Sequence, residues 1–290
     1  MNYREKTVRL GKTSPLLGIL TEPLAGTPTN GRGLVLLNAG LLHRVGPSRL
    51  HVQVAREMAP RGFQVLRFDF SGIGDSDARR DGLAFEQSAV LEVQDAMDAL
   101  AAKGVTDFTL MGLCSGADAA FLAALADPRV TGLVQLDPWI YRTWRFAVHH
   151  YLPKLRSRDS WRNLLSGDTL KRLVWQRVFP PREGPHADEV NDNVVVAHYA
   201  REFPPRAQVE QQLGALLARG VRFLCLFSGG MPEHISYAGQ FRDCFGSLPL
   251  GNQVQVHYDA TAEHIFSALH HQKMVVDTAR DWMLAERAAA

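Results

Sequence analysis

Short apolar runs alternate along most of the chain with segments in which apolar residues recur at helical spacing. The runs predict eight strands, at residues 6–10, 16–21, 33–38, 63–68, 108–112, 130–136, 221–227 and 254–258. The helical spacings predict helices at residues 48–60, 85–103, 117–126, 206–219, 235–245 and 270–287. The segment 22–32 is rich in Gly, Pro, Thr and Asn, which predicts a hairpin loop between the second and third strands.

Strands that alternate with helices indicate an α/β fold, with a mostly parallel sheet of eight strands covered by helices on both faces. We interpret residues 1–290 as one domain. The alternation stops between residues 138 and 205, where only 193–198 resembles a strand. We expect this insertion to form a helical cap over the carboxyl edge of the sheet, where ligands bind in such folds.

Composition narrows the classes of protein. The net charge of +2 gives no strong field for nucleic acid, and we expect no nucleic-acid partner. No apolar run approaches the roughly 18 residues of a membrane span, and residues 1–10 resemble no signal peptide. Three cysteines in so long a chain predict reduced thiols, and hence a cytoplasmic protein. The histidine pairs are adjacent in sequence, a poor chelating geometry, so we expect no metal and no cofactor.

The strongest chemical motif is Gly112-Leu-Cys-Ser-Gly116, between a predicted strand and a predicted helix. A nucleophile at such a strained strand–helix turn is flanked by small residues two positions away on each side. The glycines bracket Cys114, whereas a turn centred on Ser115 would place the bulky Leu113 at one of these positions. A helix N-terminus also favours the reactive thiolate. The motif therefore predicts Cys114 as a nucleophile, with a buried structural thiol as the alternative.

A cysteine nucleophile needs a base and, commonly, an orienting acid. His264 follows the last predicted strand and is our candidate base, because the other histidines nearby lie within a predicted strand or helix. Glu233 is our first choice of acid, since it is the only carboxylate between the strand 221–227 and the next helix. Asp137, at the end of the strand 130–136, is the alternative, although it also suits a turn with Pro138.

Two backbone amides are expected to form an oxyanion hole, those of Leu41 and Ser115. Gly40 lets the backbone approach a ligand closely. His43 and Arg44 follow it and either reach the mouth of a pocket or lie on the surface. The glycines of the segment Asp69–Ser76 indicate a tight turn beside the site rather than a phosphate-binding loop.

Taken together, these motifs resemble the α/β-hydrolase superfamily in their order and spacing. The segments 38–47 and 112–118 are similar to those of hydrolases encoded beside bacterial exosortase systems. A cysteine in place of the elbow serine also resembles dienelactone hydrolases and polyhydroxyalkanoate synthases. The chain departs from the superfamily by lacking an aspartate after its penultimate strand.

The resemblance and the residues imply a hydrolase of ester or thioester bonds with a covalent acyl-cysteine intermediate. One alternative is an acyltransferase that uses an amine, alcohol or thiol as acceptor, and another is a non-catalytic ligand-binding protein. Residues 141–182 carry ten Lys or Arg against two Asp, interleaved with aromatic residues. This insertion is either a solvated helical cap or a lid that meets a small acyl substrate carried by CoA or an acidic carrier protein.

Overall fold

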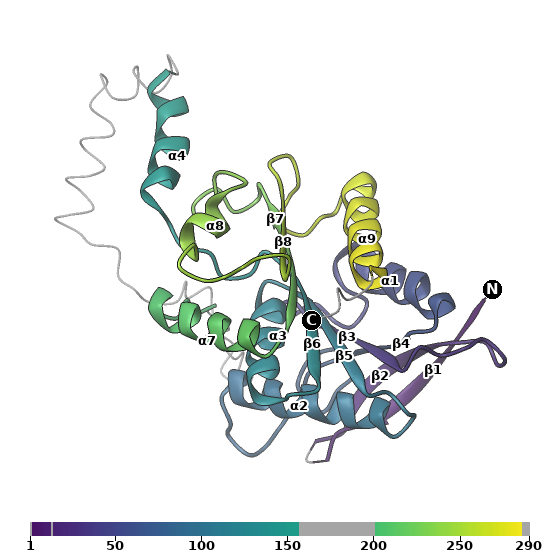
Figure 1. The fold of residues 1–290 in the computed structure, drawn as a ribbon. Coiled ribbons are helices and arrows are strands. Elements are labelled where there is room, and N and C mark those ends of the chain that lie inside the picture. The colour runs from purple at the N-terminus through teal and green to yellow at the C-terminus, as the bar shows by residue number, and fades with distance from the viewer. Residues whose placement is uncertain (1, 13, 157–200, 286–290) are drawn as a thin grey trace, which may run out of the picture.

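A computed structural model describes residues 2–12, 14–156 and 201–285 of the protein. Its eight strands form one sheet in the order β1-β2-β4-β3-β5-β6-β7-β8 (Figure 1). The strands are β1 (Tyr3–Leu10), β2 (Leu16–Pro23), β3 (Arg32–Leu37), β4 (Gln64–Phe68), β5 (Asp107–Leu113), β6 (Val130–Leu136), β7 (Arg222–Ser228) and β8 (Val254–Asp259). The eight-stranded, mostly parallel sheet predicted from the sequence is confirmed.

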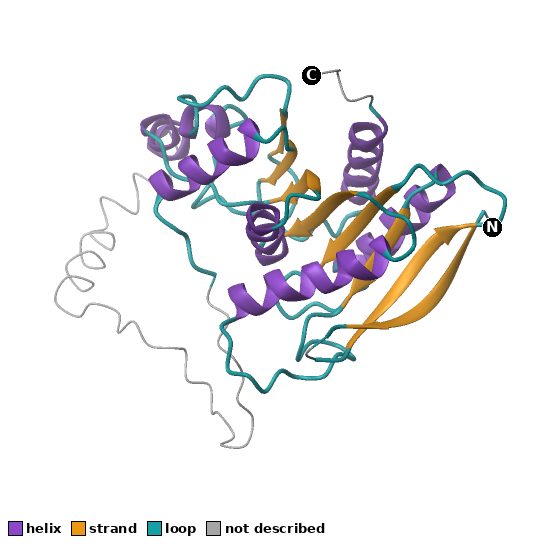
Figure 2. Ribbon diagram, turned by 60° about the horizontal axis from the view of Figure 1, so that its bottom comes forward, coloured by secondary structure: helices purple, strands orange, loops and turns teal. Residues whose placement is uncertain are grey.

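One predicted connection is wrong. The hairpin joins β1 to β2, which pair antiparallel at the edge that carries the N-terminus (Figure 2). β2 then pairs antiparallel with β4, and β3 lies on the far side of β4, parallel to it. The loop after β2 therefore crosses to a strand that is not its neighbour, and a local pattern of turn residues cannot distinguish this crossing from a hairpin.

Helices cover both faces of the sheet (Figures 1 and 2). α2 (Phe85–Ala101), α3 (Ser115–Ala126) and α7 (Arg206–Ala218) pack on one face. α1 (Leu50–Met58) and α9 (Leu269–Leu284) pack on the other. The central strands are buried along nearly their whole length, which explains why their sequences are nearly continuous apolar runs.

A short helix replaces the longer one expected at 235–245, since only α8 (Gln240–Cys244) forms there. The buried Gln240 accepts a hydrogen bond from the Ser236 amide (3.0 Å) and donates one to the Tyr141 carbonyl (3.0 Å). These side-chain bonds fix the preceding backbone in an irregular path.

The insertion predicted at 138–205 lies mostly outside the described residues, as does its one strand-like stretch at 193–198. Its two described ends join each other through Trp139 Nε1, which donates to the Glu202 carbonyl (3.0 Å), and the Tyr141 hydroxyl, which donates to the Pro204 carbonyl (2.6 Å). α4 (Trp144–Arg156) extends from the first end, away from the sheet (Figure 1). None of the helices that the structure describes combines the length and apolarity needed to cross a membrane.

Candidate active site

Cys114 occupies a strained turn between β5 and α3. Its φ of 55° and ψ of −118° lie in a region that residues with a side chain rarely adopt. A Cβ atom on Gly112 would lie 2.2 Å from the Gly116 carbonyl carbon, and one on Gly116 would lie 2.5 Å from the Asn38 oxygen. Both glycines are therefore required by close backbone packing around the half-buried thiol.

The neighbouring Ser115 has a different position. It is 1 % exposed, and its Oγ accepts a hydrogen bond from the Gly40 amide at 2.7 Å. The hydroxyl thus ties the loop after β3 to the start of α3, while the thiol of Cys114 occupies the apex of the turn.

His264 lies in the loop after β8 and contacts two predicted partners. Its Nδ1 is 2.7 Å from Oδ2 of Asp137, which directly follows β6. The thiol of Cys114 lies close enough to the imidazole to contribute to the raised pKa of His264. Cys114, His264 and Asp137, which are far apart in sequence, therefore form one line at the carboxyl edge of the sheet.

Asp137 has a positive φ of 47°, and hydrogen bonds hold its side chain in place. It is 1 % exposed, and Ser228 donates to it twice, from its amide to Oδ1 (2.7 Å) and from its hydroxyl to Oδ2 (2.7 Å). Ser228 ends β7, where the superfamily commonly has its acid. In the sequence, this arrangement is marked by Ser228 at the end of β7 and by Gly229 and Gly230 directly after it.

Glu233, our first choice of acid, forms no hydrogen bond or ion pair with His264 among the described residues. Its side chain is 56 % exposed and lies 3.7 Å from Nε2 of His234. The Glu233 carbonyl accepts a hydrogen bond from Arg142 Nε (2.7 Å), at one described end of the insertion. The structure places Asp137, the alternative acid, beside His264 instead.

The surroundings of His264 and Cys114 shift the pKa values of both groups. The hydrogen bonds from Asp137 and Cys114 raise the pKa of His264 to about 9, against the effect of burial. Burial raises the pKa of the Cys114 thiol, but the hydrogen bond with His264 and the Arg201 charge outweigh it, so the net shift is downward from 9.0. Opposite shifts in adjacent groups favour a thiolate–imidazolium pair.

The predicted oxyanion hole involves the loop after β3, which the Gly40 amide joins to Ser115 Oγ. Gly40 has a φ of 52°, and Leu41, 73 % exposed, follows it in the turn. The buried Asn38 braces this turn by donating to the Leu42 carbonyl (2.7 Å) and accepting from the Phe70 amide (2.9 Å). Within the described residues, neither the Leu41 nor the Ser115 amide donates to another backbone group.

Arg44 and His43, considered as substrate contacts, differ in their surroundings. The Arg44 guanidinium forms ion pairs with the fully buried Asp69 and with Asp75 (2.6 Å). It is thus occupied in holding the loop after β3 against the turn after β4. His43 is exposed near that loop, and its role as a substrate contact stays a prediction.

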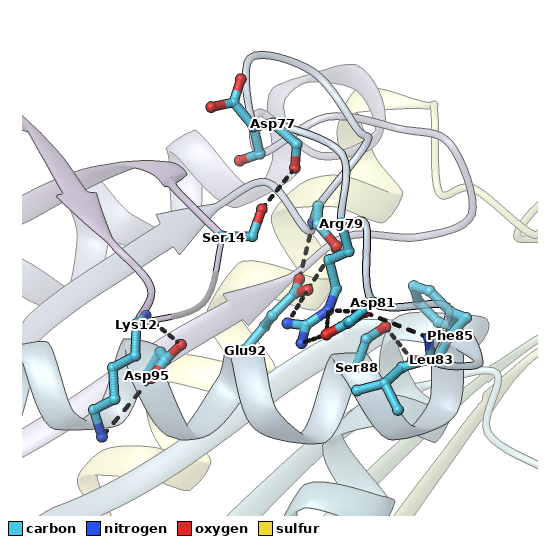
Figure 3. Close-up of polar contacts among 12 residues, drawn as sticks. Lys12, Ser14, Asp77, Arg79, Asp81, Leu83, Phe85, Ser88, Glu92 and Asp95 are labelled. Atoms are coloured by element: carbon cyan, nitrogen blue, oxygen red, sulfur yellow. Dashed lines mark hydrogen bonds and ion pairs between the residues drawn. The ribbon is translucent and has the colours of Figure 1, made fainter.

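The segment Asp69–Ser76 forms the tight turn that the sequence indicated. The Ser76 hydroxyl donates to the Asp69 carbonyl (2.7 Å), and Ser71 donates to the buried Glu92 of α2 from its amide (2.9 Å) and its hydroxyl (2.6 Å). Arg79 lies between Glu92 and Asp81 (Figure 3). These contacts use the polar groups of the turn for structure and bind the turn to α2.

A mainly apolar pocket of about 210 Å³ opens beside Ser115. Its walls come from the start of α2, from α3 and from the two ends of the insertion, and its apolar lining comprises Phe85, Ala119, Leu122, Trp139 and Pro204. Three carboxylates also line it, on Glu86, Asp118 and Glu202. The sequence analysis did not identify this pocket, because its walls come from four separate segments.

Comparisons with known proteins concern the fold. A family profile described as "alpha/beta hydrolase fold" matches residues 33–166. The sequence matches none of the curated proteins with which it was compared.

Solved structures are similar over the whole chain. They include an esterase of Pyrococcus furiosus, 11% identical with a TM-score of 0.61, covering 97% of this chain and 90% of the other. A proline iminopeptidase of Mycobacterium smegmatis is 14% identical, with a TM-score of 0.58 and coverage of 96% and 97%. An α/β serine hydrolase of Xanthomonas campestris, described as lacking a lid, is 13% identical, with a TM-score of 0.54 and coverage of 98% and 97%. At these identities the likeness concerns the fold.

Proposed function

We propose that this chain, which has the fold of the α/β-hydrolase superfamily, is a hydrolase of ester or thioester bonds with Cys114 as its nucleophile. The observation that carries the proposal is the contact line from the Cys114 thiol through His264 to the buried Asp137. Nucleophile, base and orienting acid are the three roles that acyl transfer requires.

In the proposed reaction, the Cys114 thiolate attacks the carbonyl carbon and forms a carbon–sulfur bond. The oxyanion that develops accepts hydrogen bonds from the Leu41 and Ser115 amides. The His264 imidazolium then gives its proton to the leaving alcohol or thiol, which departs and leaves an acyl-cysteine. Water attacks this thioester, its proton passes to His264, and the carbon–sulfur bond breaks to release the carboxylic acid and the thiolate.

The pocket beside Ser115 suits the acyl part of the substrate. Its volume of about 210 Å³ equals that of roughly seven water-sized groups at ~30 Å³ each. The apolar walls fit a short neutral acyl chain, whereas the exposed Glu86 and Glu202 would repel an acyl group that carries a terminal negative charge. Acyl-CoA belongs among the donors to be tested, because residues 141–182 are strongly basic.

The test is to incubate the protein with acyl-CoA thioesters and activated aryl esters and to follow intact mass and turnover. The wild type should gain the mass of one acyl group, while Cys114→Ala should gain none and lose at least ~10²-fold of the turnover. Cys244→Ala, which removes a buried thiol bonded to the Tyr141 carbonyl (2.9 Å), is the matched control and should keep the adduct.

The fate of the adduct separates the related activities. Decay in water supports a hydrolase, and decay only with added amine, alcohol or thiol supports an acyltransferase. Wild-type turnover by Cys114→Ala would refute the cysteine mechanism. Ligand binding without any adduct or turnover would favour a non-catalytic protein.

A further inference from the structure

A buried ion pair lies next to the proposed active site and has no part in the reaction derived above. Arg201 Nε is 2.6 Å from Asp118 Oδ2, and Arg201 Nη2 is 2.7 Å from Asp118 Oδ1. The two side chains are only 11% and 7% exposed. A bidentate pair of this kind fixes both position and orientation.

The pair connects elements that carry two different catalytic groups. Asp118 lies in the first turn of α3, where its amide donates to the carbonyl of Cys114 at 3.1 Å. The same Arg201 guanidinium donates from Nη2 to the carbonyl of Asp137 at 3.0 Å. One side chain thus spans the nucleophile helix and the backbone of the proposed acid.

Phe203 adds to the placement of this guanidinium, whose carbon lies 5.1 Å from the centre of the ring. Arg201 is therefore held by a carboxylate, a carbonyl and an aromatic face. Removing two charges from water costs free energy, so a buried ion pair contributes little net stability. We therefore attribute this pair to a role other than stability.

We infer that Arg201 is a positioning residue that holds the Asp137 turn against the nucleophile helix and so keeps His264 aligned on Cys114. The inference rests on the proposed function. The effects of the neighbouring charges on the Cys114 thiol agree with this geometry. The Arg201 charge lowers the pKa of Cys114, and the Asp118 charge raises it. The other charged groups that act on the thiol are His264 directly and Asp137 through His264.

The test measures the alkylation of Cys114 by iodoacetamide against pH, followed by intact mass, because this readout needs no substrate. Arg201→Met should move the midpoint upward by roughly 0.5–1 pH unit, since a positive charge near the thiolate is lost. Asp118→Asn should move it downward, since a negative charge is lost. Both should slow acylation by ~10-fold or more, because the Asp137 turn is no longer held. Arg201→Lys should restore part of the midpoint but little of the rate.

Arg129→Met is the matched control. Arg129 makes a similar bidentate pair with Asp127, at 3.0 and 2.7 Å, before the amino end of β6, opposite the end that leads to Asp137. This variant should leave the midpoint and the acylation rate unchanged.

A wild-type midpoint and acylation rate in Arg201→Met would overturn the inference, as would a shift of the same sign in Arg201→Met and Asp118→Asn. If Arg201→Met does not fold, the downward shift in the near-isosteric Asp118→Asn decides alone. Failure of the proposed function is recognised separately, by full turnover in Cys114→Ala.

Discussion

Ser228, at the end of β7, donates two hydrogen bonds to the carboxylate of Asp137, at the end of the neighbouring strand β6. The carboxylate therefore has one oxygen shared between Ser228 and His264 and the other bound to the Ser228 amide. Two adjacent strand ends thus build the acid together, one by supplying the carboxylate and the other by fixing its orientation.

Replacing Ser228 by Ala removes the hydroxyl donor and keeps the amide donor. We expect turnover to fall by ~10-fold, because Asp137 stays in place but its Oδ2 loses a partner that orients it toward His264. Steady-state kinetics on an aryl ester would measure this. Ser236→Ala, which removes a hydroxyl that donates to the Phe146 carbonyl (3.3 Å), should have near wild-type kinetics.

The identity of the acid can be tested by two conservative substitutions. Asp137→Asn should lower turnover by at least ~10²-fold, because the amide cannot stabilise the imidazolium that forms during acylation. Glu233→Gln should have little effect, since that side chain is 56 % exposed and pairs with His234 at 3.7 Å. Equal losses in both variants would contradict the assignment of Asp137.

Thiol reactivity should depend on pH in a direction set by His264. The pKa of Cys114 lies below its ordinary 9.0, so alkylation should reach half its maximum below that pH. In His264→Ala the hydrogen bond and the charge are lost while burial and the Arg201 charge remain, so the midpoint should rise. An unchanged midpoint would show that the imidazole does not act on the thiol.

Acylation by an ester should also have an alkaline limit. Proton donation to the leaving group needs the imidazolium, and the pKa of His264 is raised to about 9. The acylation rate should therefore rise as Cys114 ionises and fall as pH passes about 9. The two midpoints belong to the coupled pair. Single-turnover rates across pH would measure both limbs, and a rate still rising above pH 10 would contradict this assignment.

The pocket beside Ser115 can be tested by filling it. Leu122→Trp should reduce kcat/KM for hexanoyl esters by ~10-fold or more while sparing acetyl esters, since the larger side chain takes the space of the distal carbons. Leu91→Trp, on α2 at a position already 44% exposed, is the matched control. An equal loss for acetyl and hexanoyl esters would place the acyl group elsewhere.

The sequence predicted the strands and the strained turn at Cys114 because both depend on local patterns. Buried strands need continuous apolar runs, and the turn at Cys114 needs Gly112 and Gly116 on either side. The sequence could not show which of Asp137 and Glu233 lies beside His264, because that depends on where two strand ends lie in space. The path of the chain after β2 was wrong for the same reason.

Arg201 shows a further limit of sequence reasoning. Its partner Asp118 is 83 positions away, and Arg201 lies beyond the basic segment 141–182. No spacing rule connects the two residues, since their contact is created by the return of the chain to α3. By contrast, Gly229 and Gly230 carried a readable signal, because a Cβ on Gly230 would lie 2.1 Å from the amide of His264.

The position of Asp137 at the end of β6 affects how this protein can change over evolutionary time. In the proposed mechanism Ser228 at the end of β7 orients Asp137, and the loop from Met231 onward carries no catalytic carboxylate. We therefore expect changes in the loop from Met231 onward to leave the proposed arrangement of Cys114, His264 and Asp137 in place. By contrast, an insertion just after Asp137 would displace the proposed acid and disturb the proposed reaction.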